Sequence, residues 1–204
     1  MEAVKVWLGG EGPCELGTRT DGGDEPGVIE ALLLRVEPKG WIVEGAQRWK
    51  YIRKYRAGHA ARGGRNHEDL HNVLGLALKA KDVGCKVLAF TRDVDADDRR
   101  ADAIARGIAL AGELFPALVI VGGVACPAIE GWMLALLGVR DSDAMSRVRT
   151  LELLRDREIE KKNADAYVEI VNAADLAHLP VGCGSLTDWL STARTQLGRV
   201  LRGS

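Results

Sequence analysis

Short apolar runs alternate along the chain with longer stretches in which apolar residues recur every three or four positions. The runs have the length of buried strands, whereas the longer stretches have the period of a helix with one apolar face. The expected strands are residues 3–8, 41–43, 86–91 and 117–121, and the expected helices are residues 28–36, 67–82 and 96–114. This alternation is typical of an α/β fold, in which helices flank a parallel sheet on both faces.

The last third of the chain has helical periodicity and no strong strand pattern. Expected helices cover residues 142–159, 163–177 and 185–201. The last of them places Leu186, Leu190 and Leu197 on one face. We therefore predict an α/β core of residues 1–140 and a helical C-terminal extension, residues 141–204, packed on that core.

Composition narrows the class of protein. The chain has 204 residues, of which 47% are hydrophobic and 28% are charged, as in an ordinary globular domain. Lys and Arg number 28 and Asp and Glu number 29, which gives a net charge of −1. A nucleic-acid partner would therefore have to be held by a local basic patch. The four cysteines form no C-x-x-C pair, so they indicate neither a zinc ribbon nor a redox motif.

The chain also lacks the patterns of membrane insertion and export. Its N-terminus has no basic segment followed by a long apolar one. The longest uncharged run, residues 114–129, is interrupted by Gly and Pro and is shorter than the ~20 residues of a membrane helix. We expect a soluble, cytoplasmic protein with no membrane partner.

Acidic residues follow the strand expected at 86–91. In an extended segment Asp93 and Asp95 point the same way, and Asp97 is the next in the alternation. Adjacent carboxylates repel each other, and a bound cation such as Mg²⁺ or Mn²⁺ is the simplest compensation. Asp97 or Asp98 could instead cap the following helix. An EF-hand loop is excluded because it requires Gly and Glu where Asp98 and Ile104 stand.

A glycine-rich turn with two acidic residues, Glu11 and Glu15, follows the first expected strand. Pro13 removes a backbone N–H, and an anionic Glu11 is unsuited to a phosphate-binding loop. The chain contains no G-x-x-x-x-G-K-[ST] motif, so it carries no Walker-type ATPase site. The first strand therefore presents an acidic residue at its tip, although Glu11 in a merely solvated turn is the alternative.

In combination the two acidic motifs resemble the Toprim domain. VWLGGEG is similar to its strand followed by Glu and Gly, and LAFTRDVD is similar to its strand followed by D-x-D. The spacing of Glu11 and Glu15 resembles the E-G-x-x-E form of OLD-type nucleases and of small stand-alone Toprim-like proteins. Glu130 and Trp132 resemble the E-x-W segment of these families.

The resemblance implies a divalent-metal enzyme that acts on phosphodiester bonds. Glu11, Asp93 and Asp95 would hold Mg²⁺ or Mn²⁺, and Glu15 or Glu130 would orient water or hold a second ion. Glu130 could instead only complement the positive end of its helix. Some OLD-type relatives act with an ATPase in anti-phage defence, and here the ATPase would have to be a separate protein. The chain has no obvious Tyr nucleophile of the topoisomerase type, which favours hydrolysis.

A basic segment, residues 46–66, lies between the two acidic motifs and contains no Asp or Glu. Trp49, Tyr51 and Tyr55 are interleaved with its cations. Cations neutralise phosphates and aromatic rings stack on unpaired bases, so the segment predicts binding of DNA or RNA. A solvated helix is the alternative. The cations are Arg48, Lys50, Arg53, Lys54, Arg56, Arg62 and Arg65.

Two further functions stay open. His67, Glu68 and His71 match the H-E-x-x-H pattern of zinc hydrolases, but the pattern has no clear third ligand downstream. A non-catalytic Toprim-like module that binds nucleic acid or regulates a partner is the broader alternative. We predict a metal-dependent nuclease, and homo-oligomerisation stays open.

Overall fold

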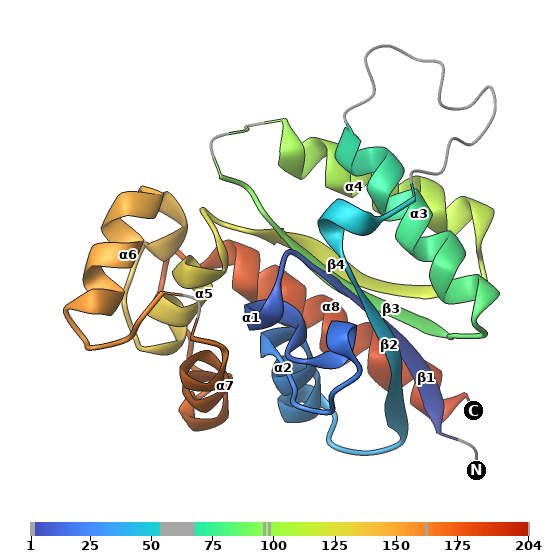
Figure 1. Cartoon of the computed structure of the whole chain (residues 1–204), viewed down its shortest axis with the longest axis horizontal. Coiled ribbons are helices and arrows are strands. Elements are labelled where there is room, and N and C mark those ends of the chain that lie inside the picture. The colour runs from blue at the N-terminus through green and yellow to red at the C-terminus, as the bar shows by residue number, and fades with distance from the viewer. Residues whose placement is uncertain (1–2, 54–67, 96, 98, 162, 204) are drawn as a thin grey trace.

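The computed structural model describes residues 3–53, 68–95, 97, 99–161 and 163–203. Within them lies one four-stranded sheet with the spatial order β2-β1-β3-β4, in which every neighbouring pair is parallel (Figure 1). The strands are β1 (Val4–Gly10), β2 (Trp41–Arg48), β3 (Val87–Asp93) and β4 (Val119–Ala125). All four carboxyl ends therefore lie at one edge of the sheet.

Helices cover both faces of this sheet. One face carries α3 and α4, and the other carries α2 and α8, with α5, α6 and α7 grouped beyond the sheet (Figure 1). The helices are α1 (Pro13–Leu16), α2 (Val28–Val36), α3 (Glu68–Asp82), α4 (Arg100–Leu114), α5 (Ile129–Leu136), α6 (Arg147–Arg155), α7 (Ala164–Ala173) and α8 (Gly184–Arg202). The predicted fold class, a parallel sheet flanked by helices with a helical C-terminal extension, is confirmed.

Alternation along the strands divides the hydrophobic core in two. In β3, Val87 and Ala89 face the core shared with α2 and α8, whereas Leu88 and Phe90 face the core shared with α3 and α4. The same alternation places Arg92 on the α3 side and Asp93 on the opposite side, where α5 follows. Each side of β3 therefore presents a different charge at the carboxyl edge.

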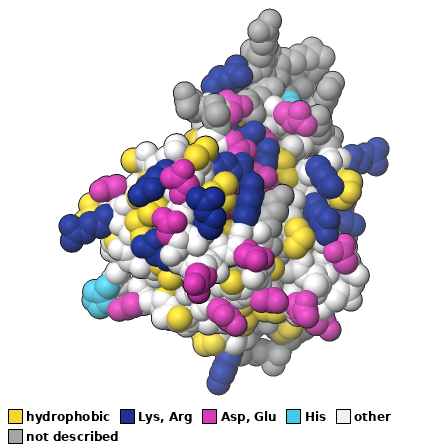
Figure 2. Space-filling model, turned by 60° about the vertical axis from the view of Figure 1, so that its left-hand side comes forward, with side chains coloured by type: hydrophobic (Ala, Val, Ile, Leu, Met, Phe, Trp, Pro, Cys, Tyr) yellow, Lys and Arg dark blue, Asp and Glu magenta, His cyan; other side chains and the backbone are white. Residues whose placement is uncertain are grey.

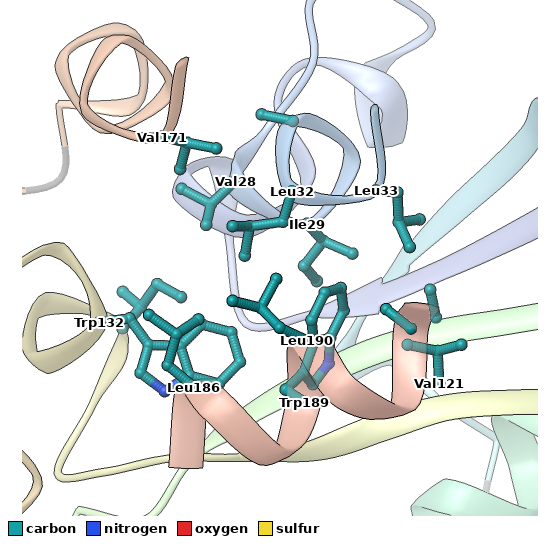
Figure 3. Close-up of a cluster of buried hydrophobic side chains, with 14 of the residues drawn as sticks. Val28, Ile29, Leu32, Leu33, Val121, Trp132, Val171, Leu186, Trp189 and Leu190 are labelled. Atoms are coloured by element: carbon teal, nitrogen blue, oxygen red, sulfur yellow. The ribbon is translucent and has the colours of Figure 1, made fainter. Parts of the chain in front are cut away.

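The helices of residues 141–204 share the larger of these two cores. Figure 3 shows Leu186, Trp189 and Leu190 of α8 packed with Ile29 and Leu32 of α2. In addition, Trp189 Nε1 donates a hydrogen bond of 3.0 Å to the carbonyl of Phe90. This bond fixes α8 to a central strand.

The strands are longer than their apolar runs. β2 continues to Arg48, β3 to Asp93 and β4 to Ala125. The polar end of β3 stays in register with β4, since Asp93 is paired with Ala125. The apolar pattern marks only the buried part of each strand, whereas backbone pairing continues past it.

Other element boundaries also differ from the sequence-based expectation. The glycine-rich turn after β1 is followed directly by the short helix α1, and α4 begins at Arg100 and not at residue 96. The helix expected at residues 142–159 is divided into a short 3-10 helix, Ser142–Ala144, and α6, which ends at Arg155. Ser146 separates the two because its hydroxyl accepts a hydrogen bond from Arg149 N–H and caps α6. Among the described residues, no helix combines the length and apolar character that crossing a membrane requires.

Candidate active site

Four of the predicted acidic site residues line one pocket at the carboxyl edge of the sheet. Glu11 follows β1, Glu15 lies in α1, Asp93 ends β3, and Glu130 lies in the first turn of α5. The pocket has a volume of about 270 Å³. We call it the acidic pocket, and its charged lining residues are Glu11, Glu15, Arg48, Lys50, Asp93, Glu130 and Arg147.

Asp93 is the most constrained of these acids. It is only 3% exposed, and its Oδ1 accepts a hydrogen bond of 2.9 Å from Ile129 N–H. Burial, together with the negative charges of Glu15 and Glu130, raises its pKa to about 7. The Ile129 bond and nearby Arg147 act in the opposite direction and do not offset this rise. Near neutral pH the protonated and the ionised forms of this carboxyl group are therefore both populated.

Glu130 and Glu15 surround Asp93 with further buried acids. Glu130 is 2% exposed, and within the described part of the chain its Oε2 has no hydrogen-bond partner. Glu15 is also buried, and its Oε2 accepts a hydrogen bond of 2.9 Å from Gly12 N–H. Gly10 permits this approach, because a Cβ there would lie 2.7 Å from Glu15 Cβ. The backbone therefore holds buried carboxylates together without compensating them fully.

Three arginines contact the remaining acids. Arg92 forms an ion pair with Glu11. Arg147 pairs with Asp95 and lies 3.6 Å from Asp93 Oδ2, so its guanidinium joins the two aspartates. Arg100 lies 2.9 Å from Asp95. Protein cations thus pair with Glu11 and Asp95, and Arg147 also reaches Asp93, at the longer distance of 3.6 Å.

A second pocket lies on the α3 side of β3. It has a volume of about 510 Å³, and we call it the lateral pocket. Its lining includes Glu11, Trp49, Lys50, Asn72, Arg92 and Arg100. Glu11 and Lys50 also line the acidic pocket, so the two pockets share a wall.

The pKa values of the two arginines of the lateral pocket are shifted in opposite directions. Burial, together with the positive charge of Arg100, lowers the pKa of Arg92 to about 10, so Arg92 stays protonated at neutral pH. Burial would also lower the pKa of Arg100, but the carboxylates of Asp69 and Asp95 outweigh burial and raise it. Both side chains are therefore stable positive charges beside the acidic pocket.

Two predicted metal ligands lie outside the acidic pocket. Asp95 does not continue the alternation of β3, because the strand ends at Asp93 and Asp95 has a φ of 53°. It remains linked to Asp93 through Arg147. Asp97 accepts a hydrogen bond of 3.2 Å from Arg99 N–H just before α4 and does not line the acidic pocket. The bond closes the turn that precedes α4, but the N-cap residue of this helix is Arg99 and no side chain caps it, so the prediction that Asp97 caps the helix is wrong.

The sequence patterns did not predict Arg92, Arg100 or Arg147 as site residues. Arg92 lies within the strand–D-x-D motif and Arg100 lies a few residues later, so a local signal for both was available. Arg147 had no such signal, because it reaches the site from α6. Only the packing of the C-terminal helices brings it to the aspartates.

Part of the predicted basic segment borders both pockets. Lys50 and Arg53 are exposed, whereas Arg48 is held by Asp21 at 2.7 Å. Lys54, Arg56, Arg62 and Arg65 lie outside the described residues. Figure 2 shows Lys and Arg side chains gathered with Asp and Glu side chains on the upper part of one face. This mixture of charge differs from a uniformly basic surface.

Only part of the H-E-x-x-H pattern falls within the described residues. Glu68 begins α3 and His71 lies one turn later, whereas His67 lies outside the described residues. Across residues 3–203, with the stated gaps, no three His, Cys, Asp or Glu side chains form a cluster that could hold a metal ion as they stand. The acids of the acidic pocket thus adjoin one another without forming a closed ligand set.

Comparison with known proteins gives no relative. No protein-family model matches the chain, and neither the curated proteins nor the solved structures that were searched contain a match. The site is therefore interpreted from its own residues and from the motif resemblance.

Proposed function

We propose that the protein is a divalent-metal-dependent phosphodiesterase that cleaves nucleic acid. The observation that supports this most is Asp93, a buried carboxyl group whose pKa is raised to about 7 by burial and by the charges of Glu15 and Glu130. Grouped carboxylates at the carboxyl edge of a parallel sheet are destabilising on their own and are common at catalytic sites. A bound cation would remove this cost.

The donor set fits Mg²⁺ or Mn²⁺. Carboxylate oxygens are the ligands that these hard cations prefer. Asp93 and Glu130, with its unpartnered Oε2, would hold the ion together with Glu11 or Glu15. Asp95 becomes a further ligand only if Arg147 leaves it. When bound, such an ion polarises a phosphate and lowers the pKa of its water ligand.

The side chains around the ion would position the substrate. Lys50 is exposed at the wall between the two pockets, where it can pair with a phosphate. Arg147 has the planar fork that binds carboxylates and phosphates alike. A carboxylate of the acidic pocket that is not bound to the ion would accept a proton from the attacking water.

Further aspects of the proposal follow from the motif resemblance. The substrate is DNA or RNA, and the setting is anti-phage defence in the cytoplasm. Because the sequence carries no Walker motif, an ATPase would be a separate subunit. Co-purification of the chain with an ATPase encoded beside it, followed by a cleavage assay with ATP, tests this part.

A non-catalytic nucleic-acid-binding module is the second candidate. The ion pairs of Arg92 with Glu11 and of Arg147 with Asp95 favour it, because they neutralise acids without a metal. The two candidates differ in metal binding. A protein that binds nucleic acid but no divalent cation would be such a module.

Metal titration followed by a nuclease panel tests the proposal. Calorimetry with Mn²⁺ and cleavage of single- and double-stranded DNA and RNA, each with Mn²⁺, Mg²⁺ or EDTA, are the measurements. Asp102→Asn is the matched control for Asp93→Asn, because Asp102 is exposed on α4 and lines neither pocket. We expect Mn²⁺ binding and cleavage in the wild type and in Asp102→Asn. Absence of divalent-metal binding in the wild type would contradict the proposal.

A further inference from the structure

The lateral pocket adjoins the acidic pocket, and its lining includes the cations Lys50, Arg92 and Arg100 beside the acids Glu11, Glu68 and Asp69. The alternation of β3 sends Asp93 to one side and Arg92 to the other, and Glu11 stands between them. Glu11 Oε1 pairs with Arg92 and lies 3.3 Å from the backbone nitrogen of Asp93. A substrate that crosses the edge of the sheet at Glu11 would therefore enter both pockets.

The lateral pocket has the size and lining of a site for one nucleoside. Its volume of about 510 Å³ is within the range of about 300–1,000 Å³ typical of small-ligand sites. Trp49 and Ile52 give it an apolar wall, and Lys50 and Arg92 give it cations. Aromatic walls beside cations are the elements that bind unpaired nucleotides.

Asn72 provides an independent indication of a ligand. This α3 side chain lines the pocket, is only 4% exposed, and its Oδ1 has no hydrogen-bond partner within the described residues. A buried acceptor without a donor costs about 1–3 kcal/mol. Every nucleobase can offer an N–H donor on its Watson–Crick edge, but only when that base is unpaired.

We propose that the lateral pocket binds an unpaired nucleoside whose phosphate occupies the acidic pocket. Asn72 accepts a hydrogen bond from the base, Trp49 packs against it, and Lys50 contacts the phosphate between the two pockets. The position of the phosphate rests on the proposed function. The substrate class is therefore single-stranded nucleic acid or an unpaired end, and an intact duplex is bound less tightly.

Binding of short oligonucleotides tests the pocket. Fluorescence anisotropy, with Ca²⁺ in place of Mg²⁺ to prevent cleavage, would compare a single strand, the same strand with abasic positions, and its duplex. We expect the single strand to bind most tightly. Asn72→Leu should weaken its binding about threefold to tenfold, as expected for one hydrogen bond. The same substitution should leave abasic-strand binding unchanged.

Asn172→Leu is the matched control, because Asn172 is exposed on α7. Asn72→Ala removes the acceptor without adding apolar bulk, and it should reproduce the effect if Asn72→Leu disturbs packing. Thermal unfolding of each variant verifies its fold. If the substitutions lower the affinity for normal and abasic strands equally, or if neither substitution lowers the affinity, the proposal is overturned.

The experiments distinguish failure of the base-binding proposal for the lateral pocket from failure of the nuclease proposal for the acidic pocket. A wild type that binds Mn²⁺ and cleaves nucleic acid, but whose preference for single strands is unchanged by Asn72→Leu, retains the proposed function and rejects the pocket. A wild type that binds single strands through Asn72 but binds no divalent metal supports base binding and rejects the nuclease.

Discussion

The carboxylate of Asp93 accepts a hydrogen bond of 2.9 Å from the backbone N–H of Ile129, and this bond joins the end of β3 to the first residue of α5. The next residue in α5 is Glu130, so the bond that positions Asp93 also brings a second buried acid beside it. The like-charge contact is thus built into the backbone connection between β4 and α5. A cation would relieve it without any rearrangement of the strands.

Asp93→Asn should separate metal binding from folding. An amide is a poorer ligand for Mg²⁺ than a carboxylate, so metal-dependent cleavage should fall by more than about 100-fold. The hydrogen bond from Ile129 can persist, because the amide oxygen also accepts. Calorimetry with Mn²⁺, cleavage assays and thermal unfolding are the measurements. Normal cleavage by a folded Asp93→Asn protein would remove Asp93 from the site, and Glu11→Gln is tested in the same way.

The pH dependence of stability reports the charge on Asp93. The pKa of this group is raised to about 7 in the folded protein, whereas its ordinary value is 3.8. Between these values the folded protein holds a proton that the unfolded chain releases, so the stability from this group falls as pH rises from 4 to 7. The free energy of unfolding of Asp93→Asn minus that of the metal-free wild type should therefore rise across this window.

The expected rise is on the order of 2–4 kcal/mol, from the size of the pKa shift. Urea unfolding in EDTA at several pH values measures it. Asp102→Asn serves again as the control, and its difference from the wild type should stay flat. A flat difference for Asp93→Asn as well would mean that Asp93 ionises in the folded protein as easily as in the unfolded chain.

Local patterns in the sequence predicted the parallel sheet and the placement of three acids at its carboxyl edge. Glu11, Glu15 and Asp93 follow or end buried strands, and parallel strands bring such positions to one edge. The charge balance of the site was not predictable in this way. Arg147 meets Asp95 through the packing of α6, and Asp95 leaves the strand geometry at a residue with positive φ. Such contacts depend on tertiary packing, which no local pattern encodes.

Arg147→Ala should tighten metal binding and slow cleavage. In the metal-free protein the guanidinium competes with a cation for Asp95 and lies 3.6 Å from Asp93, so its removal should lower the dissociation constant for Mn²⁺. The substrate phosphate would have one cation fewer beside it, and cleavage should fall about tenfold to 100-fold. Calorimetry and steady-state kinetics measure the two effects.

Arg149→Ala is the control for this change, because Arg149 lies on the same helix and pairs only at the surface with Glu152 among the described contacts. It should alter neither metal affinity nor rate. If Arg147→Ala lowers the stability and leaves metal affinity as it was, the arginine only anchors α6 to the core.

Lys50 and Arg53 should contribute to the salt dependence of nucleic-acid binding. Both are exposed near the pockets, so each can neutralise a phosphate. Replacing both with Ala should weaken binding and reduce the log–log salt slope by about 0.7–0.9 for each phosphate that is no longer neutralised. Anisotropy titrations over a range of salt concentrations measure the slope.

Lys39 and Lys86 offer a control with equal loss of charge. Both are exposed and precede β2 and β3, at the opposite edge of the sheet. Their double Ala variant should keep the wild-type slope. Equal slopes for the two double variants would show that binding follows overall charge and not a surface near the site. The same experiment with Arg53, Lys54 and Arg56 all changed to Ala extends the test to residues beyond the described part.

Two glycine substitutions should have opposite effects on stability. A Cβ on Gly131 would lie 2.3 Å from the carbonyl oxygen of Cys126, so Gly131→Ala must displace α5 from the segment that follows β4. A Cβ on Gly112, in α4, would meet no atom within 4 Å. Gly112→Ala should therefore raise the free energy of unfolding by about 0.5–1 kcal/mol through helix propensity alone. Gly131→Ala should lower it by about 1–3 kcal/mol, as overpacking does.

The Gly131 substitution also tests how the site is built. Because Gly131 lies between Glu130 and Trp132 in the first turn of α5, displacing this turn moves Glu130 away from Asp93. Mn²⁺ affinity should therefore fall in Gly131→Ala, although no ligand has been changed, whereas Gly112→Ala should bind Mn²⁺ as the wild type does. Urea unfolding and calorimetry on the same samples give both quantities. Unchanged Mn²⁺ affinity in a destabilised Gly131→Ala protein would mean that the metal is held without Glu130, by the acids of β1, α1 and β3.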